Sequence, residues 1–267
     1  MFIRKNKMNS SRTGRRKPIV SAALLAIGLS LTGGIYAAFT ATTASAEVDL
    51  KSPQVIEEGS KLFAANCATC HGQQAQGTKN GPSLIGVGAA AVDFQVGTGR
   101  MPMEANSAQA PVKPVEFKDE QVKALAAYVA SLAPGPSIPS QSQLTGGNVA
   151  AGGELFRINC AMCHNVAGAG GALTEGKYAP ELKNVSAVHI YEAMLTGPQN
   201  MPVFNDLNLT PSDKKDIIAY LEYNKSHPSP GGIELSSLGP VSEGLFIWII
   251  GLGAIVGFTI WITAKSN

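Results

Sequence analysis

The sequence predicts a mainly α-helical chain with two small domains in tandem, a C-terminal transmembrane helix and an N-terminal signal or anchor segment. Three observations predict this organisation: a block of sequence recurs at an offset of 93 residues, the segments around it have helical periodicity, and each end of the chain carries an uncharged apolar run. We expect a basic tail with a signal peptide or membrane anchor over 1–46, a first domain over 47–132, a linker over 133–150, a second domain over 151–226, a connector over 227–243 and a transmembrane helix over 244–264.

The repeated block matches without gaps and ends in a cysteine. Residues 59–67, Gly-Ser-Lys-Leu-Phe-Ala-Ala-Asn-Cys, align with residues 152–160, Gly-Gly-Glu-Leu-Phe-Arg-Ile-Asn-Cys. Each block is followed by a proline, a Met-Pro pair and a predicted helix, over 118–132 in the first unit and 212–223 in the second. Thr210 and Pro211 form a good helix start. The intervening segment, 133–150, is rich in Pro, Gly, Ser and Gln, which is typical of a linker.

The N-terminal segment has two possible fates. Seven basic residues precede Pro18, and the 29 residues from Pro18 to Ala46 carry no charge. The ending Ala44-Ser45-Ala46 fits cleavage by a signal peptidase, whereas the length of the run fits a retained anchor, because the apolar part of a signal peptide usually spans about 7–15 residues. In either case the basic tail stays inside and the following residues lie outside.

The C-terminal run, Gly244 to Ala264, contains 21 uncharged residues. At about 1.5 Å per residue this length spans a hydrocarbon core of roughly 30 Å. Trp248 and Trp261 lie near its two ends, where interfacial aromatic residues are enriched, and Lys265 follows on the inner side. The alternative, a buried core helix, rarely runs this long without a charge. Both ends therefore place residues 47–240 on the outer face of the cell membrane.

Charge outside the tail argues against a nucleic-acid partner. From Glu47 to Pro240 the chain has 13 basic and 18 acidic residues, a net charge of −5. The basic residues of this region form no patch. The four cysteines are too few for a disulfide scaffold, so their spacing has to indicate their role.

Two Cys-x-x-Cys-His motifs predict two covalently bound haem c groups. Cys67, Cys70, Cys160 and Cys163 would form the thioethers, and the adjoining His71 and His164 would be the proximal iron ligands; these six residues make up both motifs. A zinc site would need more Cys or His ligands in each unit. A thioredoxin-like site or a disulfide pairing would leave the two histidines unexplained.

The sixth iron ligand in each unit is expected to be a methionine, the usual partner in electron-carrying cytochromes c. Met101 lies 34 residues after Cys67, with Met103 as its rival, and Met201 lies 41 residues after Cys160. Met194 falls in a predicted helix and is expected in the core. Met162 lies inside its own attachment motif and cannot reach the far face of the haem.

Four further residues have alternative interpretations. His189 offers a bis-histidine ligand, but it has no counterpart in the first unit, so a surface or core role is favoured. His227 has no assigned role. The carbonyl groups of Pro82 and Pro180 are candidates to accept the ring N–H of the proximal histidines, a contact that orients metal ligands. Otherwise these two residues are plain loop prolines.

These residues carry a family resemblance. Each unit resembles a class I cytochrome c domain, with an N-terminal helix, Cys-x-x-Cys-His, a Met-Pro loop and a C-terminal helix with an aromatic residue (Tyr128, Tyr220). The whole layout resembles the dihaem cytochrome c subunit (cytochrome cc) of the actinobacterial cytochrome bcc complex, a quinol:cytochrome c reductase. The segment from Glu47 to Pro53 is short, which departs from the layout of this family and says little about how the first domain docks on the membrane.

The resemblance implies an electron carrier within an enzyme complex. Its implied partners are the Rieske iron–sulfur subunit, the cytochrome b subunit and a haem-copper terminal oxidase, with electrons entering through the first haem and leaving through the second. A retained N-terminal segment would place both termini in the cytoplasm. The alternatives are a dihaem cytochrome serving another dehydrogenase and a dihaem peroxidase. A peroxidase needs an iron with an open or displaceable sixth position, whereas both units here offer a methionine.

Overall fold

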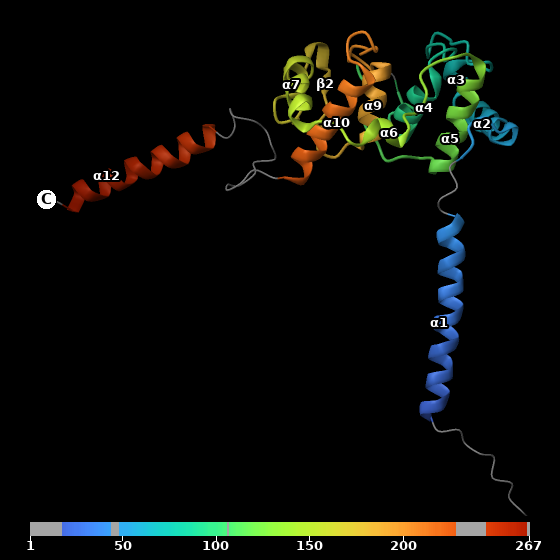
Figure 1. The fold of residues 1–267 in the computed structure, drawn as a ribbon. Helices are drawn as coiled ribbons and strands as arrows, with labels where there is room; N and C mark the ends of the chain where they lie inside the picture. The colour runs from blue at the N-terminus through green and yellow to red at the C-terminus, as the bar shows by residue number, and fades with distance from the viewer. Residues whose placement is uncertain (1–17, 44–47, 106, 228–243, 266–267) are drawn as a thin grey trace, which may run out of the picture. The chain divides into compact units, whose positions relative to one another are not determined.

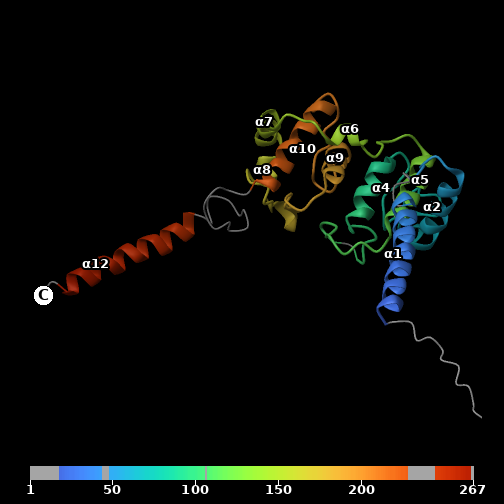
Figure 2. The same cartoon turned by 60° about the horizontal axis from the view of Figure 1, so that its bottom comes forward.

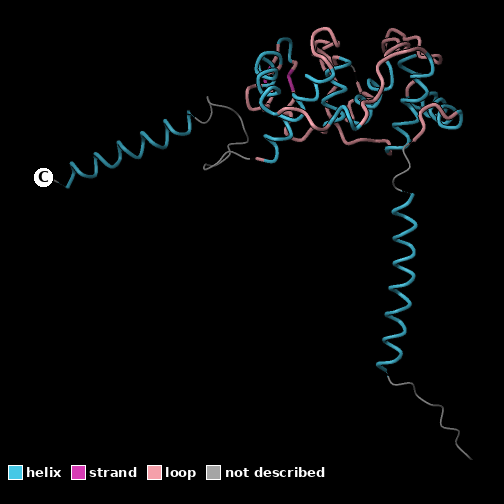
Figure 3. The backbone as a smooth tube through the Cα atoms, in the orientation of Figure 1, coloured by secondary structure: helices cyan, strands magenta, loops and turns pink. Residues whose placement is uncertain are grey.

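The computed structural model describes residues 18–43, 48–105, 107–227 and 244–265. The basic tail, the Ala44-Ser45-Ala46 cleavage motif and nearly all of the expected connector lie outside the described residues. The chain separates into two units, 1–48 and 49–267, and each is described by itself. The described residues are mainly helical, with a single short pair of strands (Figure 3). This confirms the predicted fold class.

The first unit is one long helix, α1 (Pro18–Thr43). The second unit contains the repeated domains and ends in a π-helical stretch, η2 (Ile247–Leu252), that continues into α12 (Gly253–Lys265). Among the described residues, two helical segments are long and apolar enough to cross a membrane, Ile19–Ala37 within α1 and Gly244–Lys265. The first lies near the N-terminus, where a signal sequence can also meet this criterion, so α1 fits either expectation for the N-terminus.

The first repeated domain contains α2 (Pro53–Asn66), α3 (Ala68–His71), α4 (Gly88–Gly97) and α5 (Asp119–Leu132). Its core forms where α2 and α4 pack against α5 (Figure 1), around Phe63, Val96, Val122 and Leu125. Gly59 allows the close crossing of α2 and α5, because a Cβ atom there would collide with the backbone carbonyl of Ala124.

The second domain repeats this arrangement with α7 (Val149–Asn159), α8 (Ala161–His164), α9 (Ala187–Thr196) and α10 (Pro211–Ser226). The strands β1 (Gly171–Ala172) and β2 (Tyr178–Ala179) pair antiparallel, with Gly171 opposite Ala179, and the short 3₁₀ turn η1 (Thr174–Gly176) connects them. Gly152 allows the close crossing of α7 and α10, as Gly59 does in the first domain, because a Cβ atom at Gly152 would collide with the carbonyl of Asp216 in α10.

The two helix crossings also share an aromatic pair. The ring centroids of Phe63 and Tyr128 lie 5.2 Å apart, and those of Phe156 and Tyr220 lie 5.5 Å apart. Both phenylalanines are almost completely buried. The repeat found in the sequence therefore corresponds to a repeated helix–helix contact, in which the Phe of the repeated block meets the Tyr of the C-terminal helix.

The local sequence explains where α10 begins. Thr210 Oγ1 accepts a hydrogen bond from the backbone N–H of Asp213 (3.2 Å), and Asp213 Oδ2 accepts one from the N–H of Thr210 (2.8 Å). This reciprocal capping confirms the predicted start of α10.

The segment expected as a linker contains a short helix, α6 (Gln141–Leu144), and its buried Leu144 belongs to the second core. A single apolar side chain in a polar segment gives no periodic signal, so composition alone indicated only a linker.

Candidate haem c sites

The attachment motifs form one helical turn each, with the same backbone geometry in both domains. Cys67 ends α2, and its carbonyl accepts hydrogen bonds from the N–H groups of Cys70 (3.1 Å) and His71 (3.0 Å). Cys160 does the same at the end of α7 for Cys163 (3.1 Å) and His164 (2.9 Å). This turn carries both thiols and the histidine of a motif on one short segment of chain. None of the four cysteines forms a disulfide.

The proximal histidines are held by the carbonyls expected from the sequence. His71 Nδ1 lies 2.8 Å from the carbonyl oxygen of Pro82, and His164 Nδ1 lies 3.0 Å from that of Pro180. The prediction that these prolines supply an acceptor is confirmed. A carbonyl acceptor fixes the Nδ1–H tautomer, which leaves the lone pair on Nε2 for an iron ion. Burial lowers the pKa of His164, and its hydrogen bond to Pro180 opposes that effect, so this imidazole is neutral at pH 7.

The candidate methionines border the same cores as the attachment cysteines. Cys67 and Met101 both pack against the first core, and Cys160 and Met201 both pack against the second. Met103 is half-buried but is not among the described residues that pack against the first core. These contacts favour Met101 over its rival and fit a haem held between a Cys-x-x-Cys-His turn and a methionine loop.

In each domain a lysine side chain donates hydrogen bonds to the segment that contains or follows the candidate methionine ligand. Lys113 Nζ donates to the carbonyl of Pro102 at 2.7 Å, next to Met101. Lys214 is fully buried in α10, and its Nζ donates to Asp206 Oδ1 (2.7 Å) and to the carbonyl of Leu209 (2.8 Å) in the segment after Met201. Sequence reasoning missed both lysines, because a lysine in a polar loop or an amphipathic helix gives no signal of burial.

The structure also shows where Met162, Met194 and His189 lie. Met194 is 2% exposed within the second core, and Met162 is 92% exposed, so the expected core position of Met194 is confirmed. His189 lies beside Asp93 and Glu192 where α4 meets α9. Sequence reasoning missed these two carboxylates, although the spacing His189-x-x-Glu192 on a helix was an available signal.

The chemistry of the donor set fits haem c better than zinc. Burial raises the pKa of Cys67 and of Cys160 to about 11. Among the described residues, no group of three potential metal ligands within 4.8 Å involves either motif. Each motif therefore supplies two cysteine sulfurs and one oriented imidazole, which fits a haem, whose iron is already bound by the porphyrin.

This repeated architecture defines the chain as a membrane-associated cytochrome c with two c-type domains. A family model described as "Cytochrome c" matches residues 56–133, and one described as "Cytochrome C oxidase, cbb3-type, subunit III" matches residues 147–221. The chain is 45% identical to the cytochrome bc1 complex cytochrome c subunit of Corynebacterium efficiens, over 97% of this chain and 94% of the relative. It is 46% identical to the subunit of that name from Mycobacterium bovis, over 99% and 98%.

The chain therefore belongs to the family of cytochrome bc1 complex cytochrome c subunits, and it is an electron-transfer subunit. A more distant relative is the cbb3-type cytochrome c oxidase subunit CcoP of Rubrivivax gelatinosus, at 34% identity over 51% of this chain and 42% of the relative.

Proposed function

We propose that this chain carries two covalent haem c groups and relays electrons between them. Cys67 and Cys70 attach the first haem, and Cys160 and Cys163 attach the second. His71 and Met101 are the axial ligands in the first domain, and His164 and Met201 are those of the second. When bound, haem c supplies an iron that accepts and releases one electron. The protein holds the ligands in place, shields the iron from solvent and keeps its sixth position filled.

The direction of transfer runs from the first domain to the second. The Rieske iron–sulfur subunit donates to the first domain, and the second domain passes electrons to a haem-copper terminal oxidase. The match of residues 147–221 to a family model of an oxidase subunit supports the second assignment. The chain acts as the electron-carrying subunit of a quinol:cytochrome c reductase that also contains cytochrome b. The filled sixth positions disfavour a peroxidase.

The observation that carries this proposal is a set of hydrogen bonds between the two domains. Gln109, in the segment after Met101, donates from Nε2 to the carbonyl of Tyr178 (2.9 Å) and accepts at Oε1 from the N–H of Tyr178 (2.8 Å). The N–H of Ala110 donates to Oε1 of Gln199, two residues before Met201 (3.3 Å). The methionine segments of the two domains are thus directly connected, which favours transfer within the chain over a diffusing carrier.

The membrane arrangement follows from the two apolar helices. The haem domains lie on the outer face of the cell membrane, where their partners can dock. The C-terminal helix anchors the second domain, and Lys265, whose Nζ lies 4.7 Å from the Trp261 ring, marks the inner end of that helix. Both termini are cytoplasmic if α1 is retained.

The test replaces one proximal histidine at a time and follows electrons from quinol in intact membranes. With His164→Ala, the haem of the first domain should still be reduced while oxygen consumption stops. With His71→Ala, the haem of the second domain should stay oxidised. Haem staining and immunoblotting confirm that each chain is assembled. The reverse pattern would show entry through the second domain, and normal oxygen consumption in an assembled variant would exclude an obligatory relay.

A further inference from the structure

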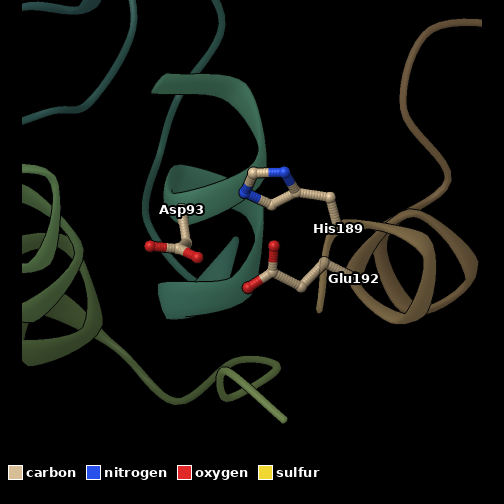
Figure 4. Close-up of side chains that lie close together, drawn as sticks. All are labelled: Asp93, His189 and Glu192. Carbon is tan, nitrogen blue, oxygen red and sulfur yellow. The ribbon is translucent and has the colours of Figure 1, made fainter. Parts of the chain in front are cut away.

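Helices α4 and α9 of the two domains lie in contact (Figure 2). Three potential metal ligands meet at this contact. Asp93 comes from α4 of the first domain, and His189 and Glu192 come from α9 of the second. Figure 4 shows the three side chains pointing toward one another across the contact. Their ligand atoms all lie within 4.8 Å of one another. His189 and Glu192 are three residues apart, so the helix places them on one face.

Glu192 has an unusual environment for a carboxyl group. Its relative exposure is 0%, and neither of its side-chain oxygens accepts a hydrogen bond from a donor among the described residues. Burying a carboxylate that has no donor is costly, since it loses the hydrogen bonds of water without replacement. A buried polar group of this kind, aimed into a cluster of potential ligands, indicates that a partner belongs there.

The neighbouring groups supply two further potential ligand atoms. Asp93 is 4% exposed, and its Oδ1 accepts a hydrogen bond from Lys123 Nζ at 2.8 Å. His189 contributes an imidazole ring from α9. Gly97 of α4 makes space for this ring, because a Cβ atom there would lie 3.2 Å from His189 Nε2.

We propose that Asp93, His189 and Glu192 bind one divalent transition-metal cation, for which Zn²⁺ is the reference, and that this cation joins the two cytochrome domains. One imidazole nitrogen with two carboxylates suits zinc and its first-row neighbours, whereas calcium and magnesium prefer oxygen ligands alone. Zinc bonds to such ligands measure about 2.0–2.2 Å, so the three side chains need to close in slightly around the ion. A water molecule would complete the coordination.

A retained proton is the competing explanation for Glu192. Burial raises the pKa of Glu192 to about 10, and the negative charge of Asp93 and a side-chain hydrogen bond to Asp93 act in the same direction. Without a cation this carboxyl is therefore neutral at pH 7 and can share its proton with Asp93. A glutamine at this position would reproduce the protonated group in size and charge, but it would supply no carboxylate to a metal. Glu192→Gln therefore separates the two explanations without opening a cavity.

The experiment uses the full-length haem-loaded chain in detergent. The protein is treated with EDTA, dialysed against Zn²⁺, desalted and measured for zinc by mass spectrometry, with the protein amount taken from amino-acid analysis. The matched control is Glu154→Gln, which changes an exposed glutamate in α7. We expect about one zinc per chain in the wild type and in the control. Glu192→Gln and His189→Ala should retain at most a tenth of that amount.

Two further measurements complete the test. Zn²⁺ should raise the melting temperature of the wild type and of Glu154→Gln but not of Glu192→Gln, because only a bound ligand stabilises the folded state by mass action. Excess Ca²⁺ or Mg²⁺ should not displace the zinc. The proposal is overturned if the wild type retains no zinc, if Glu192→Gln retains as much as the wild type, or if Ca²⁺ competes equally.

Discussion

His71 Nδ1 lies 2.8 Å from the carbonyl oxygen of Pro82, and the equivalent contact between His164 and Pro180 measures 3.0 Å. In both domains a backbone acceptor therefore fixes the ring that follows the second cysteine. The contact comes from backbone, so it depends on the path of the loop rather than on one side chain. The two domains thus orient their proximal histidines by the same kind of backbone contact.

The first prediction concerns the sixth ligands. Met101→Ala and Met201→Ala should each remove about half of the weak far-red sulfur-to-iron band of the ferric protein, because each contributes one of two His/Met haems. Met103→Ala is the matched control and should keep the full band. A pyridine haemochrome assay should give two c haems per chain in all three variants. Loss of half the band in Met103→Ala, with none lost in Met101→Ala, would exchange the two assignments.

The second prediction concerns the helix crossings. Gly59→Ala and Gly152→Ala should destabilise their domains, because the new methyl group collides with a backbone carbonyl that cannot rotate away. Overpacking costs about 1–3 kcal/mol, although the gain in helix propensity returns up to about 1 kcal/mol. Chemical unfolding followed by circular dichroism measures the difference. Glu58→Ala, an exposed change in α2, should stay within about 0.5 kcal/mol of the wild type. Equal stability of Gly59→Ala would show that the helices can separate without cost.

The third prediction concerns the lysines that hold the methionine loops. Lys214→Met should destabilise the second domain by about 1–3 kcal/mol, because the buried carbonyl of Leu209 loses its donor. Lys113→Met should have a smaller effect, since the Lys113 side chain is 18% exposed and water can replace it. The temperature at which the far-red band is lost reports both effects. The prediction fails if Lys113→Met lowers that temperature more than Lys214→Met does.

Much of the fold and of the backbone geometry at the candidate haem sites could be predicted from the sequence, because the signals were local or repeated. The Cys-x-x-Cys-His motifs, the capping of α10 and the proline carbonyls all depend on residues close together in the chain. The burial of Lys214 and the meeting of Asp93 with Glu192 depend instead on tertiary contacts. Asp93 and Glu192 lie on equivalent helices of the two domains, α4 and α9, but the repeat itself does not indicate that these helices meet. Their proximity appears only when α4 packs against α9.

The fourth prediction concerns anchoring. A fragment of residues 47–240 lacks both apolar helices, so it should be soluble when expressed in the exported compartment and should still take up both haems. Ultracentrifugation of the cell lysate, followed by haem staining of each fraction, measures this. A matched fragment of residues 47–267 keeps the C-terminal helix and should sediment with membranes. Sedimentation of the shorter fragment in the absence of partner subunits would locate the membrane attachment in the haem domains.

The last prediction concerns the contact between the methionine segments. Gln109→Ala removes both hydrogen bonds to the backbone of Tyr178, each worth about 0.5–1.5 kcal/mol. Losing about 1–3 kcal/mol favours separation of the domains by a factor of roughly five to 150. We expect electron transfer from the first haem to the second to slow in flash-photolysis measurements, whereas the absorption spectra of both haems should stay unchanged. Gln73→Ala, an exposed change next to the first attachment motif, is the control and should transfer at the wild-type rate. An unchanged rate in Gln109→Ala would mean that the two hydrogen bonds to Tyr178 are not needed to hold the domains together.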